Sequence, residues 1–247
     1  MLGIIFMKIG IIQTRGIGDI IIAAPIAMYY IAKGHDVYWP VDERFIKPFS
    51  LAFPSINFIG IPISIPLHSA DYFYLEPKRI LEKIGCDKTF CLYSFLSANF
   101  DFGQTALEKR LFESLPFDCY KYAIANVPFS EKWNLKINRD IQRENALYEK
   151  LNISPSEDYV VIHQESAGFK APISQLLKNY PKVITIEPIT DNFFDWIDVL
   201  ENCKAAFLID SLYANLVEQL NLPITKTLYL RSPHPFTPIF KNDWRYI

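Results

Sequence analysis

Residues 8–25 read KIGIIQTRGIGDIIIAAP, and the rest of the chain is arranged around this stretch. It starts as a β-branched strand over residues 8–12, passes through a turn that contains Gly16 and Gly18, and enters a long apolar helix at Asp19. This order predicts an open α/β domain with a ligand site at the end of its first strand. The glycines let the backbone approach a ligand, the helix start offers free N–H groups, and Asp19 adds a carboxylate beside them.

Length and composition indicate a globular protein. The 247 residues are enough for one large domain or two small ones, each with its own core. Half of the residues are hydrophobic and 21% are charged, which argues against a disordered chain. The formal net charge of −2 leaves no basic face of the kind that nucleic-acid binding needs, so we expect no nucleic-acid partner.

The chain shows no sign of export or of membrane insertion. Its cysteines are scattered without a C-x-x-C pair, which indicates free thiols in a reducing compartment and argues against a zinc site. Residues 1–13 begin apolar but lack a basic n-region and a small-residue cleavage site, so we expect no signal peptide. The apolar run over residues 17–31 is broken by Asp19 and Pro25 and is too short to span a membrane. We therefore expect a cytoplasmic protein.

Strand and helix patterns alternate in both halves of the chain. After the first strand, further strands are expected at residues 35–39, 56–59, 71–75, 159–163, 183–186, 205–209 and 225–230. Helices are expected at residues 19–33, 43–52, 76–84, 104–115, 139–151, 192–202 and 211–220. A charged helix and a Ser/Pro segment separate the halves. We therefore expect a Rossmann-like domain at residues 1–153 and a smaller one at 154–247, whose tail returns to the first.

The Gly16-Ile-Gly18-Asp19 turn differs from two common phosphate-binding loops. A dinucleotide fingerprint needs a third glycine or alanine where Ile21 stands. A P-loop needs a Gly-Lys-Ser/Thr sequence, and none follows the turn. The turn is therefore neither of these loops.

With Thr14 before it and Pro25 behind it, the turn resembles the opening of heptosyltransferase-like glycosyltransferases, which are family 9 and its relatives in the GT-B superfamily. In that family a loop of this form ends the first strand, and its Asp is regarded as the base that activates the acceptor hydroxyl. The resemblance maps this role onto Asp19. It also implies an acceptor-side loop made of Thr14, Arg15, Gly16 and Gly18. Arg15 either offsets donor charge there or is a rim residue.

A second motif lies near the end of the chain. The strand at residues 206–209 runs into Asp210-Ser211, which resembles the family's strand, Asp-Ser/Thr and helix that faces the donor phosphates. Ser211 at a helix start can donate its hydroxyl and its backbone N–H to a phosphate oxygen. The family normally has Gly and His where Leu212 and Asn215 stand.

The third motif, HQESAGFK at residues 163–170, follows the strand that opens the second half. Enzymes of the family place a small-residue loop here, with a lysine that meets the donor phosphates. Lys170 is the natural cation for a diphosphate leaving group, and Ser166 and Gly168 suit a loop that approaches a ligand closely. The alternative for Lys170 is a solvated surface lysine.

Several other residues have two interpretations each. His163 either hydrogen-bonds a nucleotide or sugar or is a structural group, and Glu165 is a weaker candidate for ribose recognition. The stretch RSPHP at residues 231–235 resembles the segment after the last strand of related short glycosyltransferase-like proteins. Its Arg231 and His234 either reach the cleft or lie in a surface turn.

The aromatic residues of the middle segment also have two interpretations. The residues concerned are Phe100 to Phe102, Tyr120 and Tyr122. They either line a pocket or form ordinary core, and the core interpretation is favoured.

Together the motifs predict a GT-B-like α/β fold with two Rossmann-type halves facing each other across a cleft. The implied reaction transfers a sugar from a nucleotide-diphosphate sugar donor to a hydroxyl acceptor such as a glycan, without a metal or other cofactor, because N–H groups and a cation can hold the diphosphate. Two alternatives stay open, since fold does not fix function. One is a sugar-nucleotide epimerase or hydrolase on the same scaffold, and the other is a degenerate, non-catalytic nucleotide-sugar-binding protein.

Overall fold

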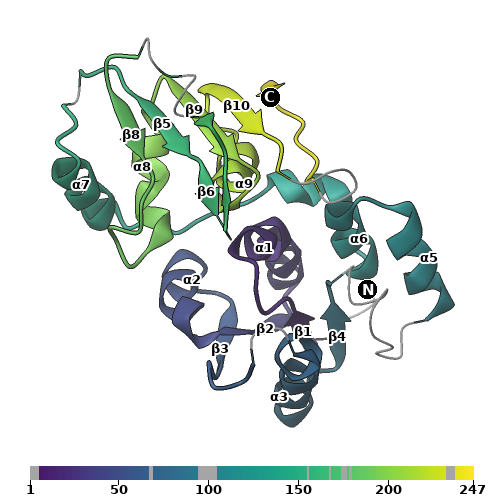
Figure 1. Cartoon of the computed structure of the whole chain (residues 1–247). Helices are drawn as coiled ribbons and strands as arrows, with labels where there is room; N and C mark the ends of the chain where they lie inside the picture. Colours follow the sequence, from purple (N-terminus) through teal and green to yellow (C-terminus); the bar gives the residue numbers. More distant parts are fainter. Residues whose placement is uncertain are drawn as a thin grey trace. The chain divides into compact units, whose positions relative to one another are not determined.

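The computed structural model describes residues 6–66, 69–93, 105–154, 156–166, 168–173, 177, 180–231 and 237–247. The chain divides into two compact units, Met1–Asn138 and Arg139–Ile247. Each unit contains a parallel β-sheet with helices packed against it (Figure 1). The chain is therefore an α/β protein with two Rossmann-type units.

The first unit is organised around a sheet with the strand order β3-β2-β1-β4. Its strands are β1 (Lys8–Ile12), β2 (Asp36–Asp42), β3 (Asn57–Ile61) and β4 (Lys88–Cys91). β1 pairs in parallel with β2 on one side and with β4 on the other. The chain thus reverses its course across the sheet at β1, and open α/β sheets bind their ligands at such switch points.

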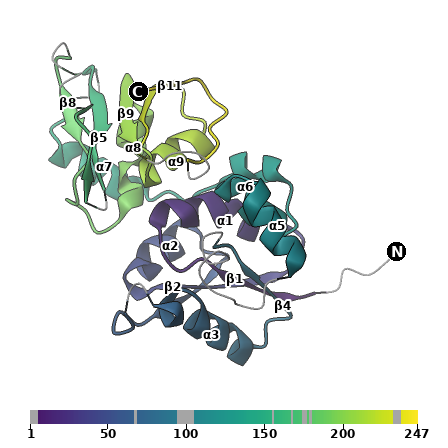
Figure 2. The same cartoon turned by 45° about the vertical axis from the view of Figure 1, so that its right-hand side comes forward.

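Helices cover both faces of this first sheet (Figures 1 and 2). They are α1 (Ile17–Ala32), η1 (Glu43–Phe45), α2 (Ile46–Ala52), η2 (Asp71–Leu75), α3 (Glu76–Ile84), α5 (Ala106–Ser114), α6 (Phe117–Ile124) and η3 (Phe129–Trp133). α6 packs beside α1, whereas α3 lies on the opposite face of the sheet. Gly10 allows this approach of α3, because a Cβ at Gly10 would lie only 2.8 Å from the Leu81 side chain.

α1 is the central helix of the first core. Residues 20–27 of this helix are all buried, including Pro25. A helix that is apolar around its whole circumference belongs in the interior of a domain. Its burial fixes the loop between β1 and α1 in the first unit.

The second unit has a sheet with the strand order β11-β10-β9-β5-β8, in which neighbouring strands pair in parallel. Its strands are β5 (Val160–His163), β8 (Val183–Thr185), β9 (Ala205–Ile209), β10 (Thr225–Tyr229) and β11 (Trp244–Tyr246). A short hairpin of β6 (Glu165–Ser166) and β7 (Phe169–Lys170) follows β5. The second switch point lies at β5, since β8 is on one side of it and β9 on the other.

The helices of the second unit pack against one another beside this sheet. They are α7 (Ile141–Lys150), η5 (Phe193–Trp196), α8 (Ile197–Glu201) and α9 (Leu212–Gln219), and α8 contacts both α7 and α9. The sequence placed α7 before the domain boundary, yet it falls in the second unit. Arg139 Nη1 donates to Glu201 Oε2 at 2.6 Å, and Arg143 Nε donates to Asp195 Oδ1 at 3.0 Å. These ion pairs join α7 and the residue before its N-cap to η5 and α8 of the same unit.

The prediction of a strand at residues 71–75 is wrong, because these residues form the helical turn η2, which continues into α3. Ser69 starts the turn, since its Oγ accepts a hydrogen bond from the backbone N–H of Tyr72 at 3.1 Å. A five-residue segment with three aromatic residues, such as DYFYL, is compatible with a strand and with a buried helical turn. β4 and α6 were not predicted at all.

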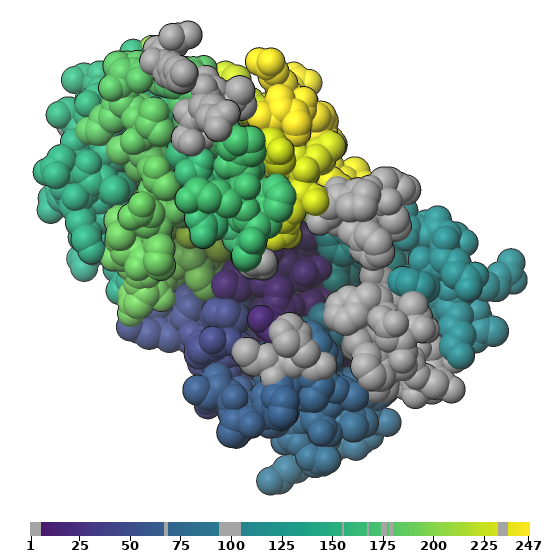
Figure 3. Space-filling model, in the orientation of Figure 1, coloured from purple at the N-terminus to yellow at the C-terminus, as the bar shows by residue number. Residues whose placement is uncertain are grey.

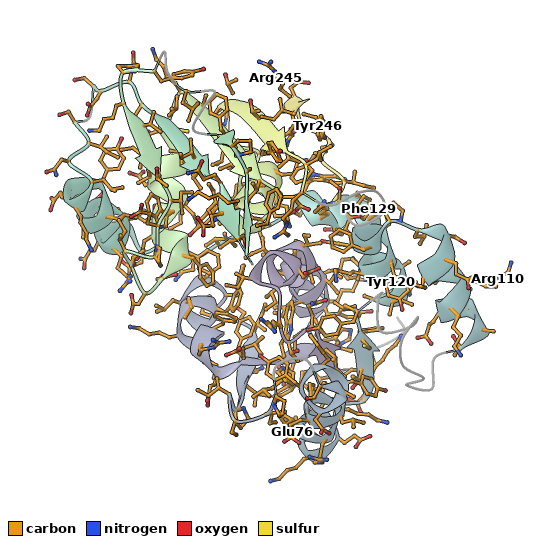
Figure 4. The ribbon with its side chains drawn as sticks, viewed as in Figure 1. Glu76, Arg110, Tyr120, Phe129, Arg245 and Tyr246 are labelled. Carbon is orange, nitrogen blue, oxygen red and sulfur yellow. The ribbon has the colours of Figure 1, made fainter. Side chains whose placement is uncertain are left out.

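Tyr120 and Tyr122 on α6 are both buried core residues (Figure 4 labels Tyr120). The Tyr122 hydroxyl donates to the carbonyl oxygen of Ile22 on α1 at 2.7 Å. The core interpretation is therefore confirmed for these two residues. Phe100 to Phe102 lie outside the residues that the structure describes.

The end of the chain joins the second sheet. β11 pairs with β10, and Figure 3 shows this segment in yellow at the surface. Arg245 and Tyr246 lie at the outer edge of the unit in Figure 4. Glu218 on α9 anchors the segment: its fully buried carboxylate accepts from Trp244 Nε1 at 2.8 Å and from the backbone N–H of Lys241 at 2.7 Å.

Replacing Glu218 by Met should therefore loosen the tail and destabilise the second unit. Several hydrogen bonds to a buried carboxylate are lost and their donors stay buried, so we expect a loss of about 3 kcal/mol in the free energy of unfolding. Urea unfolding measures the loss, and hydrogen exchange should speed up at the Lys241 amide. The exposed Glu187→Gln variant is the control and should change stability by less than about 0.5 kcal/mol. Equal stability of the two variants would show that Glu218 does not anchor the tail.

Candidate functional site

The loop after β1 leads directly into α1 at the first switch point. Gly16 is the N-cap of α1 and has left-handed φ and ψ angles of 78° and 85°. A Cβ at Gly16 would lie 2.5 Å from Oδ2 of Asp19. The turn thus needs glycine both for its backbone conformation and for the space beside the carboxylate. Gly18 lies in the first turn of the same helix.

The inner residues of this loop are held by a buried tyrosine. Thr14 is fully buried, and its Oγ1 lies 2.8 Å from the hydroxyl of Tyr93, which follows β4. The same hydroxyl accepts from the backbone N–H of Arg15 at 2.8 Å. Burial is the main cause that raises the pKa of Tyr93 far above its ordinary value, so the phenol stays protonated. Tyr93 therefore fixes the shape of the loop that carries Asp19.

Asp19 and a lysine from α6 form an ion pair at this loop. The Asp19 side chain is 37% exposed, and its Oδ1 lies 3.2 Å from Nζ of Lys121, whose side chain is 2% exposed. The sequence singled out the tyrosines beside Lys121 but not the lysine itself. The sequence sign of a special role was a positive charge between two tyrosines in the stretch YKY. That this lysine lies beside Asp19 is visible only in the fold.

The second switch point brings His163 and Ser211 together. His163 is the last residue of β5 and Ser211 follows the neighbouring strand β9, and His163 Nδ1 lies 2.9 Å from Ser211 Oγ. The ring of Tyr213 packs edge-on against the imidazole, with 4.9 Å between the ring centroids. Burial, followed by the charge of Arg231, lowers the pKa of His163 from 6.5 to about 4. His163 is therefore neutral at pH 7, and Arg231 is close enough to influence it.

Ser211 is the N-cap of α9, but its side chain makes no capping hydrogen bond. Its hydroxyl therefore remains available to a ligand beside its contact with His163. Asn215, one turn along the helix, is buried and donates from Nδ2 to the Ser211 carbonyl oxygen at 2.8 Å. Asp210, before the cap, is also buried. Leu212 is buried as well.

The hairpin of β6 and β7 carries the other predicted donor residues. Glu165 pairs with Lys170, and Ser166 pairs with Phe169, around a turn that contains Gly168. Lys170 Nζ lies 3.2 Å from Glu165 Oε2, and the lysine side chain is 67% exposed. Exposed ion pairs of this kind contribute little to stability, so the lysine can exchange its partner for an anionic ligand at little cost.

The structure thus gathers the predicted residues into two clusters. In the first unit, Asp19 lies with the buried Thr14 and the half-buried Arg15 around the Gly16 turn. In the second unit, the ends of β5 and β9 hold a cluster of His163, Ser211, Asn215 and Arg231. His234 lies outside the described residues.

Within the described residues there is neither a metal cluster nor a membrane helix. In that part of the chain, no three His, Cys, Asp or Glu side chains gather so as to hold a metal ion. None of the helices there is long and apolar enough to cross a membrane. The cysteines are free thiols.

No protein-family model and no curated protein matches the sequence. Solved structures are similar in fold. The family 9 glycosyltransferase of Veillonella parvula DSM 2008 superposes with a TM-score of 0.62 at 11% identity, over 98% of this chain and 86% of that one. The E. coli ADP-heptose LPS heptosyltransferase II gives a TM-score of 0.58 at 14% identity, over 98% and 90%. The E. coli heptosyltransferase WaaC with ADP-2-deoxy-2-fluoro heptose gives 0.53 at 15%, over 98% and 93%.

These neighbours confirm the expected fold class, because all three are glycosyltransferases that match nearly the whole chain. The fold is the GT-B-like α/β fold, and the resemblance to heptosyltransferases holds at the level of structure.

The Gly16→Ala variant should be less stable than a matched glycine variant elsewhere. Any L-residue at φ near 78° costs about 1–2 kcal/mol, and at this position the new Cβ also clashes with Asp19. Gly34→Ala is the control, because Gly34 has φ 84° and a Cβ there would meet nothing within 4 Å. Thermal unfolding should show a larger loss for Gly16→Ala, and equal losses would mean that the carboxylate does not occupy this space.

Half-buried His163 should make the second unit less stable in acid. Its folded pKa of about 4 lies below its ordinary value of 6.5, so between these pH values the unfolded chain binds a proton that the folded chain does not. The contribution of His163 to the free energy of unfolding should therefore be fully present above pH 6.5. As the pH falls to about 4, the free energy of unfolding should drop by about 3 kcal/mol.

His163→Gln isolates this effect from other acid-sensitive groups. The difference in unfolding free energy between the wild type and His163→Gln should shrink by the same amount between pH 7 and pH 4. NMR titration of the imidazole checks the cause directly. A difference that does not vary with pH would contradict the lowered pKa.

Proposed function

We propose that this chain is a glycosyltransferase that moves a sugar from a nucleotide-diphosphate sugar to a hydroxyl acceptor. The observation that carries the proposal is Asp19, a part-exposed carboxylate on the first turn of α1 at the β1 switch point. The surrounding loop is otherwise held by buried groups, so this carboxylate is both accessible and fixed. The similarity in fold to family 9 glycosyltransferases supports the same assignment.

In the proposed reaction Asp19 is the general base. It takes the proton of the acceptor hydroxyl while that oxygen attacks the anomeric carbon of the donor sugar. The bond between the anomeric carbon and the diphosphate oxygen breaks, and its electron pair leaves with the diphosphate. The glycines of the loop leave room for a sugar beside the carboxylate.

The second unit holds the diphosphate in this proposal. Ser211 contributes its hydroxyl, and the start of α9 contributes backbone N–H groups and the positive end of the helix dipole. When Nδ1 of neutral His163 carries the ring proton, it donates to Ser211 Oγ, and the serine proton is then free for a phosphate oxygen. Lys170 and Arg231 offset the charge of the leaving group.

The finer features of the reaction are also proposals. Cations and helix N–H groups make a metal unnecessary for departure of the diphosphate, so we propose metal-independent transfer. An ADP-sugar is the first donor to try, because the neighbours include an ADP-heptose heptosyltransferase and an ADP-fluoroheptose complex. We propose a glycan as the acceptor and the cytoplasm as the location, in keeping with free thiols.

The Asp19→Asn variant should lose sugar transfer and keep donor binding. Asparagine keeps an oxygen beside Lys121 Nζ but cannot take up the proton of the acceptor. A thermal-shift panel of nucleotide sugars and nucleoside diphosphates first identifies the donor, since a ligand at a hundred times its Kd adds about 2.7 kcal/mol of stability. Transfer is then measured with labelled donor.

Asp71→Asn is the control, because Asp71 is an exposed aspartate of the first unit outside the loop. It should transfer sugar at the wild-type rate. Wild-type rates from Asp19→Asn would remove Asp19 from the role of base. Donor turnover without any acceptor would favour the hydrolase or epimerase alternative.

A further inference from the structure

We propose that Lys121 is the positioning residue that sets the Asp19 carboxylate for catalysis, an inference that rests on the proposed function. Lys121 lies on α6, far along the sequence from the loop, and no sequence motif pointed to it. Its side chain is 2% exposed, so the ammonium itself does not reach the acceptor. It acts through the carboxylate that it holds.

The ammonium group of Lys121 has three oxygens around it. Its Nζ donates to Gln13 Oε1 at 2.7 Å and to the carbonyl oxygen of Leu92 at 3.0 Å, and it forms an ion pair with Asp19 Oδ1 at 3.2 Å. The ring of Phe117 lies 5.4 Å from Nζ and adds a cation–π contact. The two hydrogen bonds hold the buried ammonium in place beside Asp19 Oδ1.

The other two oxygens belong to the ends of neighbouring strands. Gln13 lies just after β1. Its carbonyl oxygen accepts from Trp39 Nε1 at 3.0 Å, and its side-chain Nε2 donates to the carbonyl oxygen of Arg15 at 2.8 Å. The backbone N–H of Leu92, just after β4, donates to the carbonyl oxygen of Ile12 at 3.0 Å. Lys121 therefore bonds to two residues that are themselves hydrogen-bonded at the ends of β1 and β4.

This contact distinguishes the two oxygens of the carboxylate. Oδ1 is paired with Lys121, whereas Oδ2 lies on the side of Gly16, 2.5 Å from the position that a Cβ at Gly16 would take. Oδ2 is thus the oxygen that accepts the proton of the acceptor. Without the lysine, the carboxylate would rotate about its side-chain torsions, and misplacement of a base by about 1 Å can cost about a hundredfold in rate.

The competing explanation is a purely structural ion pair, and the chain offers a matched control for it. Lys132 and Asp118 form a second lysine–aspartate pair at 2.8 Å with both side chains buried. Asp118 lies on α6, like Lys121, and its ion pair with Lys132 is separate from the one that Lys121 makes with Asp19. Loss of Lys132 therefore tests general damage to α6.

The experiment compares Lys121→Met with Lys132→Met in the full chain. Each variant should lower the melting temperature, because each leaves polar partners without their ammonium. Only Lys121→Met should lower kcat, by about tenfold to a hundredfold, with the KM for the donor within about twofold of the wild type. Lys132→Met should keep kcat within about twofold. The double variant with Asp19→Asn should be no slower than Asp19→Asn alone, because the lysine acts through that carboxylate.

Equal kcat values for Lys121→Met and Lys132→Met would overturn the inference and leave the proposed function intact. If Lys121→Met does not fold, Lys121→Gln takes its place, since its amide keeps a donor for Gln13 or Leu92. Wild-type kcat in Lys121→Gln would equally overturn the inference. If the wild type transfers sugar from no donor, the proposed function fails and the catalytic role of Lys121 fails with it, and the inactive wild type distinguishes this outcome from the others.

Discussion

The ammonium of Lys121 joins the ends of β1 and β4 to α6 and to the carboxylate of Asp19. Burying a lysine is costly unless a counter-charge and hydrogen bonds compensate it, and here one carboxylate and two carbonyl-type oxygens do so. The arrangement also meets two requirements of a catalytic base. A base must remain exposed to its substrate and yet keep one orientation, and a buried partner on one oxygen achieves both.

Each unit places its candidate residues at a switch point of its own parallel sheet. In the first unit the ends of β1 and β4 provide a loop with a fixed carboxylate, and in the second the ends of β5 and β9 provide a hydroxyl, a neutral imidazole and a helix start. The chemistry differs accordingly. A carboxylate suits proton removal from a neutral hydroxyl, whereas hydroxyl and N–H donors with nearby cations suit a diphosphate. This division of roles is what the proposed sugar transfer requires.

Local sequence signals predicted the parts of the fold that depend on neighbouring residues. β-branched residues, a glycine turn and an apolar helix predicted β1, the loop and α1, and the Asp210-Ser211 motif predicted the β9–α9 junction. The residues that contact these motifs from a distance were not predictable. Lys121 and Gln13 are 108 positions apart, and Trp244 meets Glu218 only after the tail has folded onto α9. Such contacts follow from packing and not from local pattern.

In the proposed reaction the second unit binds the nucleoside diphosphate while the β1–α1 loop serves the acceptor. Hydrogen exchange of the full chain, with and without saturating ADP or UDP, tests this division directly. We expect slower exchange of the backbone amides at residues 211–216 and in the hairpin after His163, with exchange at residues 15–20 unchanged. Protection of residues 15–20 by the diphosphate, with residues 211–216 unaffected, would contradict it.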